Sequence, residues 1–76
     1  MKYSAEVREF IYENEANRRY YWALNNYNLA KAAVEDYDFA ACRRHLTIAR
    51  KQKNIMNEAI KFRDKARAEM AETPTK

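Results

Sequence analysis

Cys42 and His45 are the one cysteine and the one histidine of this 76-residue chain, and they lie three positions apart. On a helix that spacing places two side chains on adjacent turns, where both can bind one metal ion. A structural zinc site needs about four ligands, so the pair supplies only half of one. As a nucleophile and its base, the pair lacks a third group that would orient the imidazole. We therefore predict neither a metal site nor a catalytic residue at this pair, and we interpret Cys42 as a small core residue.

Carboxylates gather near the start of the sequence, where Glu6, Glu9 and Glu13 recur at helical spacing. They share one face of a helix, but no histidine accompanies them, and a solvated face or pairing with basic residues explains them. The chain contains no glycine, so it lacks the glycine-rich loop that holds phosphates in the known motifs. With neither a catalytic set nor a phosphate loop, we expect that the protein is not an enzyme and binds no cofactor.

Basic residues of the second half form one candidate binding face. On a helix they cover about a third of the circumference along roughly 33 Å, which is long enough to follow a nucleic-acid backbone through phosphate contacts. Acidic residues interrupt the same helix, and this favours a charged face in water; an acidic partner and nucleic acid stay open as alternatives. The basic residues are Arg43, Arg44, Arg50, Lys51, Lys61 and Lys65.

A cluster of arginines and aromatic residues forms a second candidate binding surface. Successive residues of a helix turn by about 100°, so Tyr20, Tyr21 and Trp22 sweep about 200° of its surface and cannot all enter one seam. Tyr20 fits a stripe with neighbouring alanines, but the others need a second surface. They can form a protein interface, where Tyr, Trp and Arg are enriched, or a stacking platform for single-stranded nucleic acid. The predicted interface consists of Arg18, Arg19, Tyr21 and Trp22.

Two long helices must position these residues. The chain has no glycine and one proline, and it is rich in Ala, Glu, Lys, Arg and Asn, a composition that favours helix. One break interrupts the helical pattern, at residues 35–38. We therefore predict an all-α fold, a long antiparallel helical hairpin with one helix over about 4–36 and another over about 39–71.

The predicted helix ends have recognisable residue types. Ser4 and Asp38 are suited to the N-caps of the two helices, and an aspartate in the turn can adopt the left-handed conformation without glycine. Pro74 stops the second helix. We predict a single domain over residues 1–72 and a disordered tail over 73–76.

The apolar pattern allows two shapes for the first helix. One stripe near its start lies nearly opposite a longer stripe that follows, so either the helix kinks near 13–17 and folds back, or the two stripes contact different partners. The first stripe is Tyr3, Val7, Phe10 and Ile11, and the second is Ala16, Tyr20, Ala23, Leu24, Tyr27, Ala30 and Val34.

The second helix has an apolar face that is wider than a two-helix contact requires. A dimer that forms a four-helix bundle would cover it. The expected seam is Phe39, Cys42, Leu46, Ala49, Lys53, Met56 and Ile60, flanked by Ile48, Ile55, Ala59, Phe62 and Ala66.

The segment DFAACRRHLTIA at 38–49, preceded by LAKAA at 29–33, resembles the inner half of a tetratricopeptide hairpin, in which small residues let two helices approach closely. The resemblance covers about a quarter of the chain, has no second copy, and lacks the glycines and closing proline of that repeat. A single unit of such a repeat cannot bury its own face. We infer no function from it.

Charge and hydropathy limit the partners. Residues 1–38 carry a net charge of −2 and residues 39–76 a net charge of +6, so an antiparallel pair exposes positive charge to something anionic. The longest apolar run, residues 20–24, is too short to span a bilayer, and residues 1–10 contain no signal-peptide pattern. The unpaired cysteine fits a reducing compartment. We expect a cytoplasmic protein that does not bind membranes.

The function predicted from these observations is a small non-enzymatic protein–protein interaction module that self-associates, with a dimer favoured. Small chains of this type are common among phage and mobile-element accessory proteins that bind and inhibit a host factor, of which anti-defence proteins, including anti-CRISPR proteins, are one instance. The alternative function is nucleic-acid binding through the basic face of the second helix.

Overall fold

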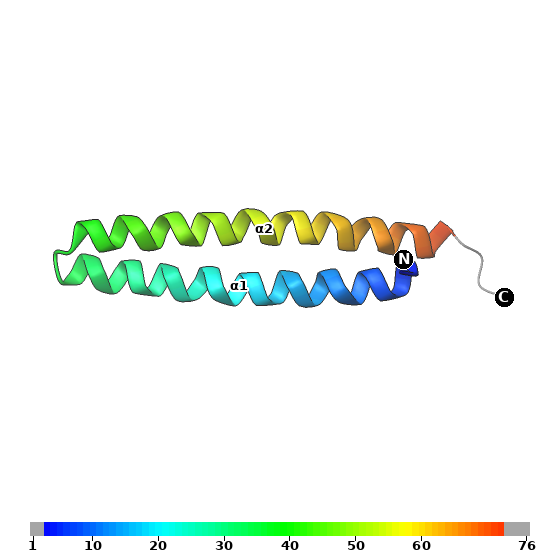
Figure 1. Cartoon of the computed structure of the whole chain (residues 1–76), viewed down its shortest axis with the longest axis horizontal. Helices are drawn as coiled ribbons and strands as arrows, with labels where there is room; N and C mark the ends of the chain where they lie inside the picture. Colours follow the sequence, from blue (N-terminus) through cyan, green and yellow to red (C-terminus); the bar gives the residue numbers. More distant parts are fainter. Residues whose placement is uncertain (1–2, 73–76) are drawn as a thin grey trace.

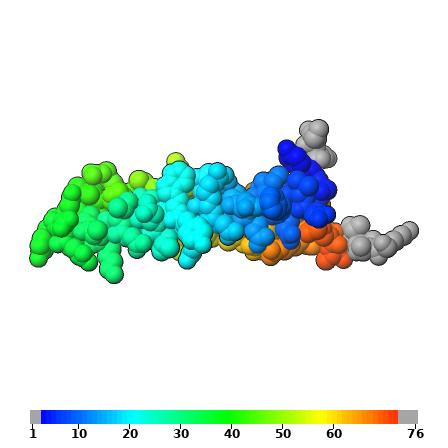
Figure 2. Space-filling view, turned by 90° about the horizontal axis from the view of Figure 1, so that it is seen from below, coloured from blue at the N-terminus to red at the C-terminus, as the bar shows by residue number. Residues whose placement is uncertain are grey.

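The computed structural model describes residues 3–72, which form two helices, α1 (Ala5–Glu35) and α2 (Phe39–Glu72). They run antiparallel as a straight rod of 60 × 20 × 14 Å (Figure 1). With α1 on the near side, a space-filling view shows no further layer of the chain over it (Figure 2). The predicted all-α helical hairpin is therefore confirmed. The predicted tail, 73–76, lies outside the described residues.

Both predicted N-caps are present. The Oγ of Ser4 accepts a hydrogen bond from the backbone N of Val7 at 3.3 Å, and Asp38 Oδ1 accepts one from the N of Ala41 at 3.0 Å. Each bond satisfies one of the donors that the first turn of a helix leaves without an intrahelical partner. The caps fix where both helices begin.

The turn differs from the prediction in the residue that takes the left-handed conformation. Tyr37, not an aspartate, has a positive φ of 59°. Its N donates to the carbonyl of Val34 at 2.9 Å, and the N of Asp38 donates to the carbonyl of Ala33 at 2.8 Å. These two bonds form a Schellman motif, in which the left-handed residue is usually glycine. The chain has no glycine, so a tyrosine occupies that position.

Helix α1 runs without interruption through residues 13–17, and its first turns do not fold back. Near its start, Arg8 contacts Glu69 of α2, so the two helices stay together along their described length. The kinked shape allowed by the sequence is therefore wrong. In the straight helix, Ala16, Ala23 and Ala30 of the second stripe are buried, whereas the first stripe stays exposed.

A seam of small residues separates the helices. Three alanines of α1 at seven-residue spacing meet three alanines of α2 there, of which the last two are seven residues apart, and among the described residues no large side chain is fully buried. Small side chains let two helices approach closely, and the seven-residue repeat keeps the same side of each helix facing the other. The buried residues are Ala16, Ala23, Asn26 and Ala30 of α1 and Ala49, Gln52, Ala59 and Ala66 of α2.

The sequence interpretation of this seam was wrong for several large residues. Tyr20 and Tyr27, which it placed in the seam, are 50% and 39% exposed. In α2, Phe39 and Lys53 are exposed, whereas two alanines expected to flank the seam are buried within it. Because the alanines bring the helices close together, the larger rings are left at the edges of the contact.

Candidate interaction surfaces

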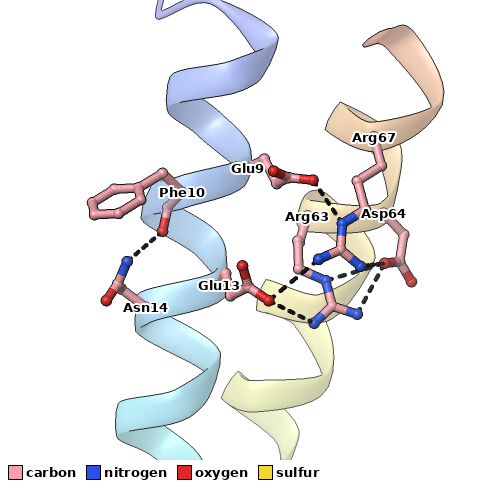
Figure 3. Close-up of polar contacts among 7 residues, drawn as sticks. All are labelled: Glu9, Phe10, Glu13, Asn14, Arg63, Asp64 and Arg67. Atoms are coloured by element: carbon pink, nitrogen blue, oxygen red, sulfur yellow. Dashed lines mark hydrogen bonds and ion pairs between the residues drawn. The ribbon is translucent and has the colours of Figure 1, made fainter. Parts of the chain in front are cut away.

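Ion pairs join the helices at the end of the hairpin where the chain begins and ends. We call residues 3–19 and 58–72 the open half. Arg67 Nε lies 2.7 Å from Glu9 Oε2, and its Nη2 lies 3.2 Å from Glu13 Oε1. Figure 3 shows these side chains between the two helices, with Arg63 and Asp64 beside them. Part of the basic charge of α2 is thus neutralised by carboxylates of α1.

A bidentate pair lies closer to the chain ends. Arg8 Nη1 and Nη2 each donate to one carboxylate oxygen of Glu69 at 2.8 Å. Hydrogen bonding to Arg8 holds the pKa of Glu69 below its ordinary value. Arg18 and Arg19 likewise lower the pKa of Glu15, with the bond from Arg18 the larger cause. Each of these carboxylates is stabilised in its charged form by a fixed guanidinium.

The other end of the hairpin has a different charge pattern. We call residues 20–34 and 39–57 the loop half; its helices contain six lysines and arginines and no carboxylate. The carboxylates at this end are Glu35, the last residue of α1, and Asp36 and Asp38 of the turn. Within residues 3–72, no ion pair forms to Arg43, Arg44, Arg50, Lys51 or Lys53. The positive charge of the protein is therefore concentrated toward the turn.

Polar side chains form contacts across the seam at two places, one where the two halves meet and one within the loop half. Arg19 Nη1 donates to Gln52 Oε1 at 2.8 Å, and Asn26 Oδ1 lies 3.2 Å from His45 Nδ1. Asn26 also donates from Nδ2 to the carbonyl of Trp22 at 3.0 Å. Its Oδ1 is thus the acceptor, and His45 Nδ1 carries the hydrogen. A shift of one helix along the other would break both pairs, so they fix the register of the hairpin.

One broad side of the rod carries an apolar groove between the helices. It is lined by Tyr20, Ala23, Leu24 and Tyr27 of α1 and by Lys53 and Met56 of α2. We call this side the tyrosine face. The sequence interpretation missed it as a site because it assigned its tyrosines to the seam.

The opposite broad side carries other apolar residues. Tyr12 stacks on Phe62 there, with ring centroids 5.2 Å apart. Arg8, one helical turn before Tyr12, lies 14 residues before Trp22 and 21 before Leu29, and Ile48 lies 14 residues before Phe62. Multiples of seven residues keep the same side of a helix, so these side chains share this face. We call it the tryptophan face. Both broad sides of the protein therefore expose large apolar groups.

The predicted aromatic interface is divided by the structure. Tyr21 and Trp22 are 67% and 47% exposed, and Arg18 is exposed beside Glu15. Arg19 instead turns inward to Gln52, and its guanidinium carbon lies 5.4 Å from the ring centroid of Trp22. Arg19 therefore positions the indole, and the other three residues remain on the surface.

The predicted basic row is also divided. All six of its residues are exposed, but Lys61 and Lys65 lie in the open half among Glu58, Asp64 and Glu69. Lys65 contributes to lowering the pKa of Glu69. The part of the row that has no carboxylate in its own half is the loop-half portion, from Arg43 to Lys51.

Cys42 and His45 both lie at the contact between the two helices. Cys42 is half-buried, and His45 bonds to Asn26. Among the residues that the structure describes, no group of three or more His, Cys, Asp or Glu side chains is arranged to hold a metal ion. Neither described helix has a stretch long and apolar enough to cross a membrane.

Comparison of the chain with protein-family models, curated proteins and solved structures found no match.

Proposed function

We propose that the protein is a non-enzymatic interaction module that associates with a second copy of itself and covers a surface of another protein. The observation that carries this proposal is the exposure of its large apolar side chains. Fifteen of them are at least 39% exposed within residues 3–72, while the seam is made of alanine and polar groups. Large exposed apolar side chains in this number are typical of interaction sites.

The stability of so small a chain supports self-association. A seam of alanines buries little apolar area, and burial stabilises by only about 25 cal/mol per Å². Two helices side by side form one layer, whereas domains normally bury their apolar surface between two. Each broad side measures about 60 by 20 Å, more than the roughly 800 Å² per partner of a standard interface. A second hairpin would supply the missing layer and complete a four-helix bundle.

A second, different partner follows from the presence of two apolar faces. A dimer through one face leaves the other exposed, and the tryptophan face carries Trp22, with Arg18 one helical turn before it. These are the residue types that dominate binding energy in protein interfaces. The sequence also suggests a narrower hypothesis, a phage or mobile-element accessory protein that inhibits a host factor. In that case the second partner would be the host factor.

Sedimentation velocity over a range from about 1 µM to 1 mM tests the self-association. We expect a monomer–dimer equilibrium and a melting temperature that rises with protein concentration, because binding to the folded state stabilises it by mass action. A monomer at every concentration, with a constant melting temperature, contradicts the proposal.

The alternative function, nucleic-acid binding, is supported by the carboxylate-free helices of the loop half and their unpaired cations. One affinity capture experiment separates the two functions. Trp22→Ala should reduce capture of a protein partner, Asn25→Ala should not, and nuclease treatment should leave capture unchanged. Capture that nuclease abolishes, together with oligonucleotide affinity that falls steeply with salt and is lost in Arg43→Glu/Arg50→Glu, would favour the alternative.

A further inference from the structure

The groove on the tyrosine face lies at the middle of the rod. Tyr20 is the central residue of α1 (Ala5–Glu35), and Lys53 and Met56 lie on either side of the centre of α2 (Phe39–Glu72). In a two-fold interface the same patch occurs on both subunits. A symmetry axis through this central groove would let the tyrosine face of each copy be covered over its whole length by the other copy.

A row of charged residues borders the groove and reverses sign across it. Arg50 and Asn57 lie three before and four after Lys53, so they are its neighbours on the helix surface. Arg43 and Asp64 continue this row at seven-residue spacing. The row therefore reads Arg, Arg, Asn, Asp from the turn toward the chain end. Its centre falls between Lys53 and Asn54, beside the groove.

We propose that the tyrosine face binds the same face of a second copy with the two hairpins antiparallel, so that Arg43 of each copy pairs with Asp64 of the other. This inference rests on the proposed self-association. In that arrangement α2 packs on α2 of the second copy, the two rows run in opposite directions, and each arginine end meets an aspartate end. Arg43 forms no ion pair within residues 3–72, and Asp64 contacts only arginines of its own helix, Arg63 and Arg67 (Figure 3).

The parallel arrangement brings like charges together. It would place both loop halves at one end of the bundle, so that twelve lysines and arginines of the helices would crowd there. The carboxylates of residues 35–38 would offset only half of them. The open halves, in which acidic residues slightly outnumber basic ones, would lie together at the other end. The antiparallel arrangement instead sets each basic half against an acidic one.

Lys53 is the residue that this arrangement does not favour. It lies close to the symmetry axis, so the axis brings it near Lys53 of the second copy, and the two positive charges repel. A lysine can direct its ammonium group to solvent while its stem covers apolar surface. The groove then holds the tyrosine rings, Leu24 and Met56 at its centre, and the lysine heads lie at its edge.

Spin-label distances test the orientation directly. With Cys42→Ala as background, a label at the exposed position 40 lies about 20 Å along α2 from the proposed axis, which gives about 40 Å between labels in the dimer. In a parallel dimer the same labels would lie within about 25 Å, roughly the width of the bundle. A label at position 54, near the axis, should give a short distance in either arrangement and controls for dimer formation.

Charge reversal and groove variants test the contacts. Arg43→Asp or Asp64→Arg should each weaken association about tenfold, since two symmetric pairs are lost, and the double variant should restore it. Arg44→Asp is the matched control and should show no coupling with Asp64→Arg. Leu24→Glu should abolish the dimer, and Asn25→Glu should not.

The outcomes are separable. A monomeric wild type would contradict the proposed self-association. A dimer with a short distance at position 40, or without coupling between Arg43 and Asp64, would contradict the antiparallel arrangement. A dimer that survives Leu24→Glu would show that the tyrosine face is not the interface.

Discussion

The two halves of the hairpin hold their helices together in different ways. In the open half, Arg8 and Arg67 bind carboxylates of the opposite helix, and Tyr12 stacks on Phe62. In the loop half, alanines and the Asn26–His45 pair form the contact, and no ion pair between helices occurs in its described residues. The buried alanines run through both halves, and ion pairs between the helices are added to them only in the open half.

This difference determines which groups are available to partners. The arginines of the open half use their donors within the chain, whereas those of the loop half stay in water beside residues 20–34 of α1, which contain no carboxylate. Surface ion pairs contribute little stability individually. We infer that the open-half ion pairs neutralise the charge of that end as much as they stabilise its helix contact. The loop half is then the charged end of the rod.

The largest expected effect comes from enlarging a seam residue. Ala49 and Ala66 are fully buried, one in each half. Ala49→Leu should lower the free energy of unfolding by about 3 kcal/mol, because the short turn prevents the helices from moving apart. Ala66→Leu should cost only about 1 kcal/mol, since the free chain ends let that half open. Chemical denaturation at one fixed protein concentration measures both.

The exposed Ala40→Leu is the control for that comparison and should change stability by less than about 0.5 kcal/mol. Equal losses for Ala49→Leu and Ala66→Leu would show that the turn does not constrain the loop half. The comparison between the halves would then rest on charge alone.

Much of this fold could be predicted from the sequence. The helix-favouring composition, the break at residues 35–38, and capping by Ser4 and Asp38 are local signals, and the structure has the two helices and both caps that they predict. The seam was only partly predictable. The heptad spacing of Ala16, Ala23 and Ala30 was visible, but rings at neighbouring positions looked equally suited to a core. Which of them faces the other helix depends on how closely the helices approach.

The candidate surfaces were less predictable because they depend on register. The net charges of the two complete helices do not reveal that charge differs between the two ends of the hairpin. This difference appears only when the start of α1 is placed beside the end of α2. Arg19 had the composition of an interface residue, yet it binds Gln52 across the seam. No pattern along the chain marks a contact between residues that far apart in sequence.

An intermediate effect is expected from acid. The pKa of Glu69 is lowered by Arg8 and that of Glu15 by Arg18 and Arg19, so their stabilisation is complete above the ordinary value of about 4.5 and is lost as the pH falls through the lowered pKa. Hydrogen-exchange protection at pH 3 should therefore decrease in the open half more than in the loop half.

Glu69→Gln serves as the control for the acid experiment. At neutral pH it should reduce protection near Arg8, and it should flatten the dependence of that protection on pH. If both halves of the wild type lost protection together in acid, the ion pairs would not be what distinguishes them.

The smallest expected effect concerns the turn that closes the loop half. A non-glycine residue in the left-handed region costs about 1 kcal/mol or more, and Tyr37 has a φ of 59°. Tyr37→Gly removes that cost but adds conformational freedom to the unfolded chain, so a net gain of about 0.5 kcal/mol is expected in thermal unfolding. The adjacent Asp36, with a φ of −91°, gains no such relief, and Asp36→Gly should destabilise. If Tyr37→Gly also destabilised the protein, the tyrosine ring, which lies edge-on to Phe39 at 6.5 Å, would contribute more to the turn than its backbone conformation costs.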